Sequence, residues 1–309
     1  MATRLTVILP VYNGMPYLPN AVESILGQSF TDFTLIIVND GSTDGSRKYL
    51  DTLRDPRIVV LNQDNAGQGA ARNAALQRCQ SEYVAVMDQD DVSITDRLAS
   101  QLSYLDAHPE VVILGTQIEF LIGNISQRAL SIPVDHDAIE ARLLKGRAGL
   151  CHPSTMFRTA ASIACGGYPT GVFGEDIDFC LRMCEQGRAA NLDRVLFQYR
   201  LHAGQASLAR CTEVVSANRY AAFNATCRRK GLPETTLSAF LLNASKLGRW
   251  LWSLEAWELI QYRTGRIRIA SGQPIEGILR LAASGIIRPF SAIARVAHAI
   301  GMSHRERTV

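Results

Sequence analysis

Acidic residues end two apolar runs early in the chain, where they could bind a cation or a polar ligand. Asp88, Asp90 and Asp91 follow the run EYVAVM, and Asp40 follows FTLIIVN. Like charges this close together need a cation, and hard oxygen ligands with open positions suit Mg²⁺ or Mn²⁺ bridging to substrate phosphates. An Asp-x-Asp pair is also common in surface turns and helix caps, so its position after an apolar strand is what strengthens the prediction.

The loops around these acids suggest nucleotide contacts, each with an ordinary structural alternative. Asp40 leads VNDGSTDGS, where its carboxylate could accept hydrogen bonds from a nucleobase and Gly41 would let the backbone approach. The alternative is a capped turn between a strand and a helix. Arg72, in NAGQGAARN, could clasp a phosphate or fix a carboxylate such as Asp88, or simply form a structural ion pair. GxxxxGK[ST] and a G-x-G-x-x-G after the first strand are absent, which disfavours P-loop NTPases and dinucleotide dehydrogenases.

Short apolar runs alternate with helix-like segments through the first hundred residues, as in βαβ units. The predicted strands are 5–11, 33–39, 57–62 and 82–88. Their nearly continuous apolar character suits strands that are covered on both faces. The polar loops should therefore meet at the carboxyl edge of a parallel sheet, where open α/β sheets bind ligands.

The pattern is less regular after residue 109. We expect strands at 111–122, 152–157 and 195–202, and helices at 135–146 and 175–187. Beyond residue 202 the composition changes to Ala, Leu, Arg and Trp at helical spacing, which places a boundary near residue 210.

The composition indicates a globular protein without a membrane-spanning helix. The chain has 309 residues, of which 47% are hydrophobic and 20% charged, and its mean hydropathy is +0.02. The start lacks the pattern of a secretory signal, so export is disfavoured. Seven cysteines at irregular spacings favour reduced cytosolic thiols over a disulfide framework or a structural zinc site.

Charge is distributed unevenly along the chain. Residues 210–309 hold 15 Lys and Arg against 6 Asp and Glu, whereas the remainder holds 17 against 23. A basic C-terminal region suggests an anionic partner such as a membrane surface or nucleic acid, and a solvated Arg-rich helical face is the alternative. The segment 277–301, which carries Arg280, Arg288 and Arg295, could be an interfacial amphipathic helix, whereas core packing is favoured for Trp250, Trp252 and Trp257.

Seven motifs occur in an order that resembles the family 2 glycosyltransferases. They are VILPVYNG, VNDGSTDGS, NAGQGAARN, DQDD, HPSTMFR, GEDIDFCLR and YRLHAGQAS, and together they cover about the first 207 residues. The resemblance implies an α/β GT-A fold with a mostly parallel central sheet flanked by helices. It further implies a GT-A domain over 1–209, and residues 210–309 would form a basic, mainly helical C-terminal region.

The resemblance also implies an inverting transfer from a nucleoside diphosphate sugar, with UDP the commonest nucleotide, and it assigns roles to individual residues. Asp90 would hold Mn²⁺ or Mg²⁺, Asp176 would be the catalytic base with Glu175 beside it, and His202 would reach the diphosphate or the metal. The nucleotide would be lined by Pro10, Tyr12, Asp40, Arg72 and Asp88.

The chemistry supports two of these roles without the resemblance. The leaving diphosphate must be stabilised and the acceptor hydroxyl deprotonated, and the base must lie across the sugar from the leaving group. Asp176 is far in sequence from Asp90, as this requires, although Glu175 and Asp176 also suit the first turn of a helix. His152 could line an acceptor pocket, but a hydrogen-bonded core histidine is the more common outcome.

The sequence thus predicts a cytoplasmic enzyme, with a place at the inner membrane face left open, that adds one sugar to a glycan or lipid-linked acceptor in surface polysaccharide assembly. The Gln-x-x-Arg-Trp motif of processive synthases is not found. We expect no nucleic acid partner, and the C-terminal region could meet an anionic membrane or a second copy of the chain. The alternatives are an inactive glycan-assembly or binding protein, or a sugar nucleotidyltransferase, which would be expected to carry a lysine-containing loop after its first strand.

Overall fold

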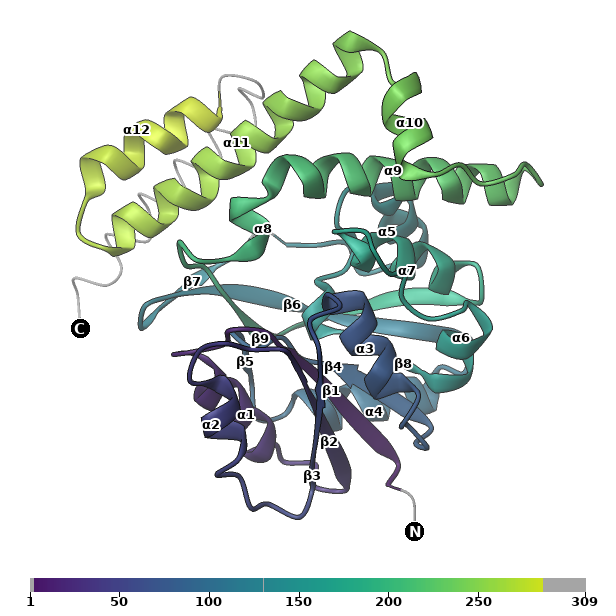
Figure 1. The fold of residues 1–309 in the computed structure, drawn as a ribbon, viewed down its shortest axis with the longest axis vertical. Coiled ribbons are helices and arrows are strands. Elements are labelled where there is room, and N and C mark those ends of the chain that lie inside the picture. Colours follow the sequence, from purple (N-terminus) through teal and green to yellow (C-terminus); the bar gives the residue numbers. More distant parts are fainter. Residues whose placement is uncertain (1–2, 130, 286–309) are drawn as a thin grey trace.

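A single mixed sheet forms the centre of the computed structural model, which describes residues 3–129 and 131–285. The strand order of this nine-stranded sheet is β3-β2-β1-β4-β8-β6-β9-β5, and β7 pairs with β6 beside this path (Figure 1). The strands are β1 (Leu5–Val11), β2 (Phe33–Asp40), β3 (Ile58–Gln63), β4 (Tyr83–Val86), β5 (Val92–Ser93), β6 (Val111–Ile122), β7 (Ile125–Arg128), β8 (Met156–Arg158) and β9 (Arg188–Arg200).

The direction of the strands places the polar loops at one edge. Strands β1 to β4 are paired in parallel, as are β6 and β9. The other four pairings of the described strands are antiparallel, so the expected mostly parallel sheet is correct only for its first half. Because β1, β2, β3 and β4 run in one direction, the loops that follow them share the carboxyl edge.

Helices cover both faces of the sheet. They are α1 (Leu18–Leu26), α2 (Ser46–Leu50), α3 (Gln68–Leu76), α4 (Arg97–Ala107), α5 (His136–Leu143), α6 (Thr159–Ala164), α7 (Glu175–Cys184), α8 (Ala206–Ala209), α9 (Cys211–Arg229), α10 (Leu237–Asn243), α11 (Lys246–Ala270) and α12 (Pro274–Ser284). Strand β1 is buried along its whole length: Leu5 and Leu9 pack with α1 and α4, whereas Ile8 packs with α3 and α7. Burial on both faces explains the continuous apolar runs.

The four described helices from α9 onward form the helical part of the chain. Helix α9 packs on α7, and its Ala221 and Ala225 belong to the same buried cluster as Ile177 and Phe179. Helix α11 packs against both α9 and α12 (Figure 1). The Ser245 hydroxyl caps α11 by accepting a hydrogen bond from Gly248 N at 3.0 Å. The expected helical character beyond residue 210 is therefore confirmed for the described residues.

Two expected strands differ from the structure. Residues His152–Ser154 form a 3₁₀ turn, and only Met156–Arg158 pairs as a strand, so the strand expected at 152–157 is wrong in its first half. Pro153 has no N–H to donate to a sheet and suits the first turn of a helix. Strand β9 begins at Arg188, earlier than the expected 195, because it continues along β6 past an irregular register near Gln117.

The predictions for the C-terminal side chains are corrected in part. Trp252 packs against the small cluster of Cys211, Val215 and Ala256, as core packing requires. Trp250 and Trp257 are 57% and 39% exposed, so core packing is wrong for these two.

The interfacial segment expected at 277–301 is described only as far as residue 285. Within it, Arg280 donates to Glu276 at 2.9 Å and to Gln261 at 3.0 Å, and both contacts are within the chain. Arg288 and Arg295 lie outside the described residues.

Candidate active site

Asp90 and His202 meet at the carboxyl edge of the sheet, although 112 residues separate them in sequence. The Asp90 Oδ2 lies 3.0 Å from His202 Nε2, and both side chains are about one-fifth exposed. The His202 ring also packs on Tyr17, with 4.6 Å between ring centroids. The loop after β9 thus brings a nitrogen ligand beside a carboxylate that solvent or a substrate can reach.

Asp91 is buried directly behind this pair. Its side chain is 1% exposed, and its Oδ1 accepts a hydrogen bond from the backbone N of Arg200 at 2.8 Å. Its Oδ2 has no hydrogen-bond partner among the described residues. Burial and the charges of Asp90 and Asp88 raise the pKa of Asp91 well above its usual value. Burial therefore favours the neutral, protonated form of the Asp91 carboxyl group.

Arg200 fixes the acidic loop, and the sequence analysis did not single it out. Its Nε donates to the Asp90 carbonyl at 2.6 Å and its Nη2 donates to Asn20 Oδ1 at 3.0 Å. Its guanidinium carbon lies 4.8 Å from the centre of the Tyr17 ring. The only available signal was its place in YRLH, two residues before His202, where a strand would present both on one face.

Arg72 joins the acidic loop to the start of α7. Its Nη2 donates to Asp88 Oδ1 at 2.8 Å, and its Nη1 donates to Glu175 Oε1 at 2.5 Å. The predicted alternative that Arg72 fixes the Asp88 carboxylate is confirmed. Because Arg72 is 2% exposed and both terminal nitrogens are bound, the geometry favours this role over a direct phosphate contact.

Close packing of α3 makes the Arg72 contacts possible. A Cβ atom on Gly69 would collide with the Pro169 carbonyl oxygen, so glycine lets α3 approach the segment before α7.

Asp40 holds the loop that leads into α3: its carboxylate accepts hydrogen bonds from Gln63 Nε2 and from the backbone N of Ala66 and Gly67, at 2.7, 2.9 and 2.9 Å. Asp40 is 2% exposed, and these contacts are those of the structural alternative, a turn that leads into a helix.

Asp176 stands at the first turn of α7, on the other side of Arg72. Its Oδ1 accepts a hydrogen bond from Ile177 N at 2.9 Å, and its side chain is only partly buried. Burial and the adjacent Glu175 carboxylate raise the pKa of Asp176 to about 6, against an opposing effect of Arg72. A carboxylate of this pKa is ionised at neutral pH and basic enough to accept a proton.

Pro10 and Tyr12 lie at the end of β1, beside the acidic loop. Pro10 is buried and pairs with Val38, whereas the Tyr12 side chain is 46% exposed. Gln89, another residue that the sequence analysis missed, bonds to Tyr12 twice: Tyr12 N donates to its Oε1 at 2.8 Å, and its Nε2 donates to the Tyr12 carbonyl at 3.0 Å. The two loops are therefore held together by backbone contacts, which sequence patterns do not reveal.

His152 belongs to the core. It is 4% exposed, and its Nε2 lies 2.9 Å from the Tyr168 hydroxyl. Burial and the nearby Arg72 lower the pKa of His152 well below its usual value, so the ring is neutral. The expectation of a hydrogen-bonded core histidine is confirmed.

The donor set at the edge suits a divalent cation that also binds substrate. Among the described residues, no three His, Cys, Asp or Glu side chains are arranged to hold a metal ion. Asp90 and His202 supply two ligands, and Mg²⁺ and Mn²⁺ accept such sets when substrate phosphates complete the shell. Behind them, the buried Asp91 Oδ2 has no hydrogen-bond partner among the described residues, which leaves a polar atom at this edge unsatisfied. The residues present therefore fit the metal that the resemblance implies.

A mixed α/β sheet with acidic loops at its carboxyl edge and a helical extension defines a protein of the GT-A transferase class. The fold is similar to that of TarS 1-349 from S. aureus in complex with UDP-GlcNAc, with a TM-score of 0.59, 18% identity, and coverage of 99% of this chain and 92% of that one. It is also similar to the mannosyltransferase PcManGT from Pyrobaculum calidifontis in complex with GDP-Man and Mn²⁺, with a TM-score of 0.56, 19% identity, and coverage of 98% and 81%.

The family described as Glycosyl transferase family 2 matches residues 6–165 of the chain. The amylovoran biosynthesis glycosyltransferase AmsE of Erwinia amylovora is 30% identical over 201 residues, which cover 63% of this chain and 75% of AmsE. The chain therefore belongs to glycosyltransferase family 2. None of its described helices is both long enough and apolar enough to cross a bilayer.

Proposed function

We propose that this enzyme transfers one sugar from a nucleoside diphosphate sugar to a glycan or lipid-linked acceptor, with inversion at the anomeric carbon. The observation that carries the proposal is the junction at Arg72, which joins the acidic loop at Asp88 to the α7 start at Glu175. This junction supports a site in which Asp176, as a partly exposed base, shares one edge with the Asp90–His202 pair. Transfer with inversion needs both groups, one on each side of the sugar.

The expected donor is a UDP-sugar. The structural relative TarS was solved with UDP-GlcNAc, whereas PcManGT was solved with GDP-Man, so the fold accommodates either nucleotide. In this proposal Pro10, Tyr12 and Asp40 line the base, and Asp88 contacts the base and ribose side. Arg72 acts through Asp88 and Glu175 and is a positioning residue.

Asp176 deprotonates the acceptor hydroxyl in the proposed reaction, and its pKa of about 6 suits that task. Asp90 and His202 would hold Mn²⁺ or Mg²⁺, which supplies charge neutralisation for the leaving diphosphate. His202 must be neutral to act as a ligand, and the Tyr17 ring orients its imidazole. Arg200 keeps the Asp90 backbone in place while the site binds and releases substrate.

The acceptor belongs to surface polysaccharide assembly in this proposal, which the name of the relative AmsE supports. We place the enzyme in the cytoplasm, because seven irregularly spaced cysteines suit a reducing compartment. The division into 1–209 and 210–309 stays a proposal. The burial of Ala221 and Ala225 in the core of the α/β part gives a reason to group α9 with the first unit.

Calorimetry with UDP- and GDP-sugars, in the presence and absence of Mn²⁺, tests the donor and the metal together. Asp90→Ala is expected to abolish the Mn²⁺-dependent part of donor binding while the fold survives, because Asp90 is partly exposed at the sheet edge. Asp96→Ala, at an exposed carboxylate that makes no capping bond to α4, is the matched control and should bind as the wild type. Unchanged metal-dependent binding in folded Asp90→Ala removes Asp90 from the site.

Product analysis separates the proposed enzyme from its rivals. An inactive binding protein would bind donor without hydrolysing or transferring it, and a nucleotidyltransferase would form a sugar nucleotide from a sugar phosphate. NMR of the new linkage reports the anomeric configuration, and a retained configuration contradicts the proposed single displacement.

A further inference from the structure

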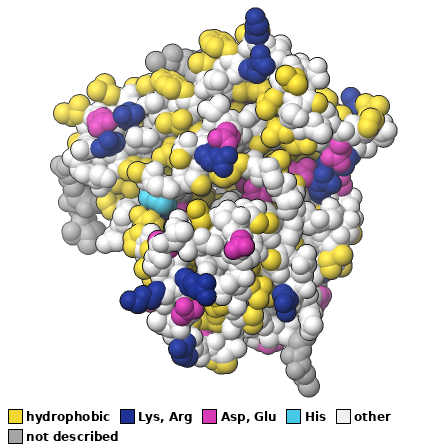
Figure 2. All heavy atoms as spheres, viewed as in Figure 1, with side chains coloured by type: hydrophobic (Ala, Val, Ile, Leu, Met, Phe, Trp, Pro, Cys, Tyr) yellow, Lys and Arg dark blue, Asp and Glu magenta, His cyan; other side chains and the backbone are white. Residues whose placement is uncertain are grey.

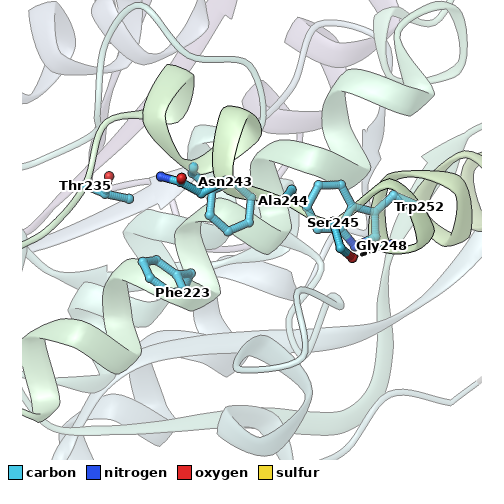
Figure 3. A pocket seen from close by; sticks show the side chains of 8 residues that line it. Phe223, Thr235, Asn243, Ala244, Ser245, Gly248 and Trp252 are labelled. Carbon is cyan, nitrogen blue, oxygen red and sulfur yellow. Dashed lines mark hydrogen bonds between the residues drawn. The ribbon is translucent and has the colours of Figure 1, made fainter.

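The first half of α11 has two faces of different character. The inner face carries Trp252, which stacks on Phe240 with 5.5 Å between ring centroids and 9° between planes. Trp252 also lines a pocket of about 240 Å³ between α9, α10 and α11, together with Phe223 (Figure 3). The inner face therefore contacts aromatic side chains of α9 and α10, and these contacts hold α11 against the two helices.

The outer face of the same turns is apolar and exposed. It consists of Leu247, Trp250, Leu251 and Trp257, which are 64%, 57%, 51% and 39% exposed. Their spacing of three, four and ten residues from Leu247 puts them on one side of a helix with 3.6 residues per turn. We call these four residues the outer face of α11. Large apolar side chains clustered on a surface mark an interaction site more often than scattered ones do.

Basic residues border the outer face, and the two acidic residues of these turns, Glu255 and Glu258, are little exposed. Lys246 and Arg249 are exposed beside Leu247 and Trp250. Glu255 accepts a hydrogen bond from Arg219 at 2.6 Å, and Glu258 is 2% exposed. Figure 2 shows basic side chains at the top of the molecule, over the start of α11, with hydrophobic side chains nearby. The surface therefore combines apolar and positive character.

The second half of α11 differs from the first because helix α12 packs against it. There the backbones approach so closely that a Cβ atom on Gly277 would lie 2.7 Å from the Gly265 carbonyl oxygen. Arg280 of α12 reaches Gln261 at 3.0 Å. In the described part of the chain, α12 covers this second half, whereas the exposures of Leu247 and Trp250 leave the first half open to a partner.

We propose that the outer face of α11 docks on an anionic membrane surface. Trp250, Leu251 and Leu247 would enter the boundary between headgroups and acyl chains, and Lys246 and Arg249 would meet the lipid phosphates. Tryptophan is favoured at that boundary, and basic residues beside an apolar helical face strengthen binding to anionic lipids. A protein partner of matched apolar shape would not require the bordering bases. The membrane is therefore the occupant that both features fit.

This docking rests on the proposed function only for its purpose, which is to bring the active-site edge to a lipid-linked acceptor. Vesicle binding needs neither donor nor acceptor. A failure of docking is therefore measured separately from a failure of transfer.

Tryptophan fluorescence gives a direct measurement, because all three tryptophans of the chain lie on α11. In Trp252→Phe the emission comes from Trp250 and Trp257, the two on the outer face. Vesicles of phosphatidylcholine mixed with phosphatidylglycerol should shift this emission to the blue, and doxyl-labelled lipids should quench it. Pure phosphatidylcholine should cause neither effect, and added salt should weaken binding. No shift with anionic vesicles, in wild type and Trp252→Phe alike, overturns the proposal.

Charge variants test the electrostatic part by vesicle sedimentation of the full chain. Lys246→Gln with Arg249→Gln should lower partitioning about twenty-five-fold, since each base near an anionic surface contributes about fivefold. Arg47→Gln with Lys48→Gln, at two exposed bases on α2, is the matched control and should partition as the wild type. Equal losses in both pairs contradict a specific role for α11.

Apolar variants test the insertion. Leu247→Ser with Trp250→Ser should lower partitioning about tenfold or more, while circular dichroism and the thermal midpoint stay near wild type because both side chains are exposed. Ile163→Ser, at a residue of α6 that is 69% exposed, is the matched control. Concentration-dependent dimerisation that these serines abolish, without vesicle binding by the wild type, would assign the face to a second copy and overturn the membrane proposal.

Discussion

The two acidic segments of the site, the loop at 88–91 and the start of α7 at 174–178, differ in how their carboxylates are held. Asp91 is 1% exposed and accepts a hydrogen bond from the Arg200 backbone, so it cannot reach a substrate hydroxyl. Asp176 is partly exposed and accepts a hydrogen bond from the next residue, Ile177. Burial and a neighbouring carboxylate raise the pKa of both groups.

This difference teaches that a raised pKa does not by itself indicate a base. The raised pKa of the buried Asp91 favours its neutral form, whereas Asp176 combines a raised pKa with a partly exposed side chain. Arg72 connects the two segments, since it binds Asp88 in one and Glu175 in the other. The following predictions are ordered from the largest expected effect to the smallest.

The largest effect is expected for Asp176→Asn. The amide keeps the shape of the side chain but cannot accept the proton of the acceptor, so turnover should fall about a hundredfold to ten-thousandfold. Donor binding should stay near wild type. Initial rates and calorimetric titration with the donor measure the two quantities.

Two controls accompany Asp176→Asn. Asp178→Asn, on the same helix, removes the negative charge from the 2.6 Å ion pair with Arg182 and should reduce stability without abolishing turnover. Asp176→Asn should instead raise the thermal midpoint at neutral pH. Because folding raises the pKa of Asp176, the ionised form costs stability as the pH rises through about 6. Near-normal turnover in Asp176→Asn would show that Asp176 is not the base, and the proposed difference between the two acidic segments would then be wrong.

The rate should depend on pH in the direction set by Asp176. The carboxylate must be ionised to act as a base, so kcat should fall about tenfold for each pH unit below about 6 and level off above it. The fold should survive this range, which circular dichroism checks. A residual rate in Asp176→Asn that keeps the same pH dependence would assign the titration to another group.

Arg200→Ala is expected to have a smaller effect, on binding more than on turnover. Loss of the contacts with the Asp90 carbonyl and Asn20 should raise the Mn²⁺ concentration for half-maximal activity about tenfold, a typical effect for a residue that orients a metal ligand. Arg200→Lys should recover only part of it, because lysine lacks the fork geometry. Arg194→Ala, at an exposed arginine on the same strand, is the control. A fall in thermal midpoint with no change in metal requirement would make Arg200 purely structural.

The sequence predicted the α/β part well because its signals are local. The run LTVILPV became β1 without a change of bounds, and VVILGTQIEFLI became β6. The prediction at 152–157 was less accurate because Pro153 starts a 3₁₀ turn within an apolar segment. Apolar character indicates burial in both cases, but turn geometry depends on individual residues.

The sequence predicted which types of residue form the site and in what order they occur, but it predicted few of the contacts between them. The motif positions led to Asp90, Asp176 and His202, and the structure brings Asp90 and His202 together. Gln89 and Arg200 were missed because the contacts by which they hold the loops at Tyr12 and Asp90 run to backbone atoms, which any residue supplies. A sequence pattern carries no signal for such partners.

The sequence by itself determined the family, the order of the acidic loops and the run of apolar strands, because hydrophobic patterning and motif spacing are properties of the chain. The tertiary structure alone decided which carboxylates are buried, that Arg72 bridges Asp88 and Glu175, and that Trp250 faces outward while Trp252 packs inward. These outcomes depend on which segments far apart in sequence pack together, and packing selects among side chains that local patterns treat alike.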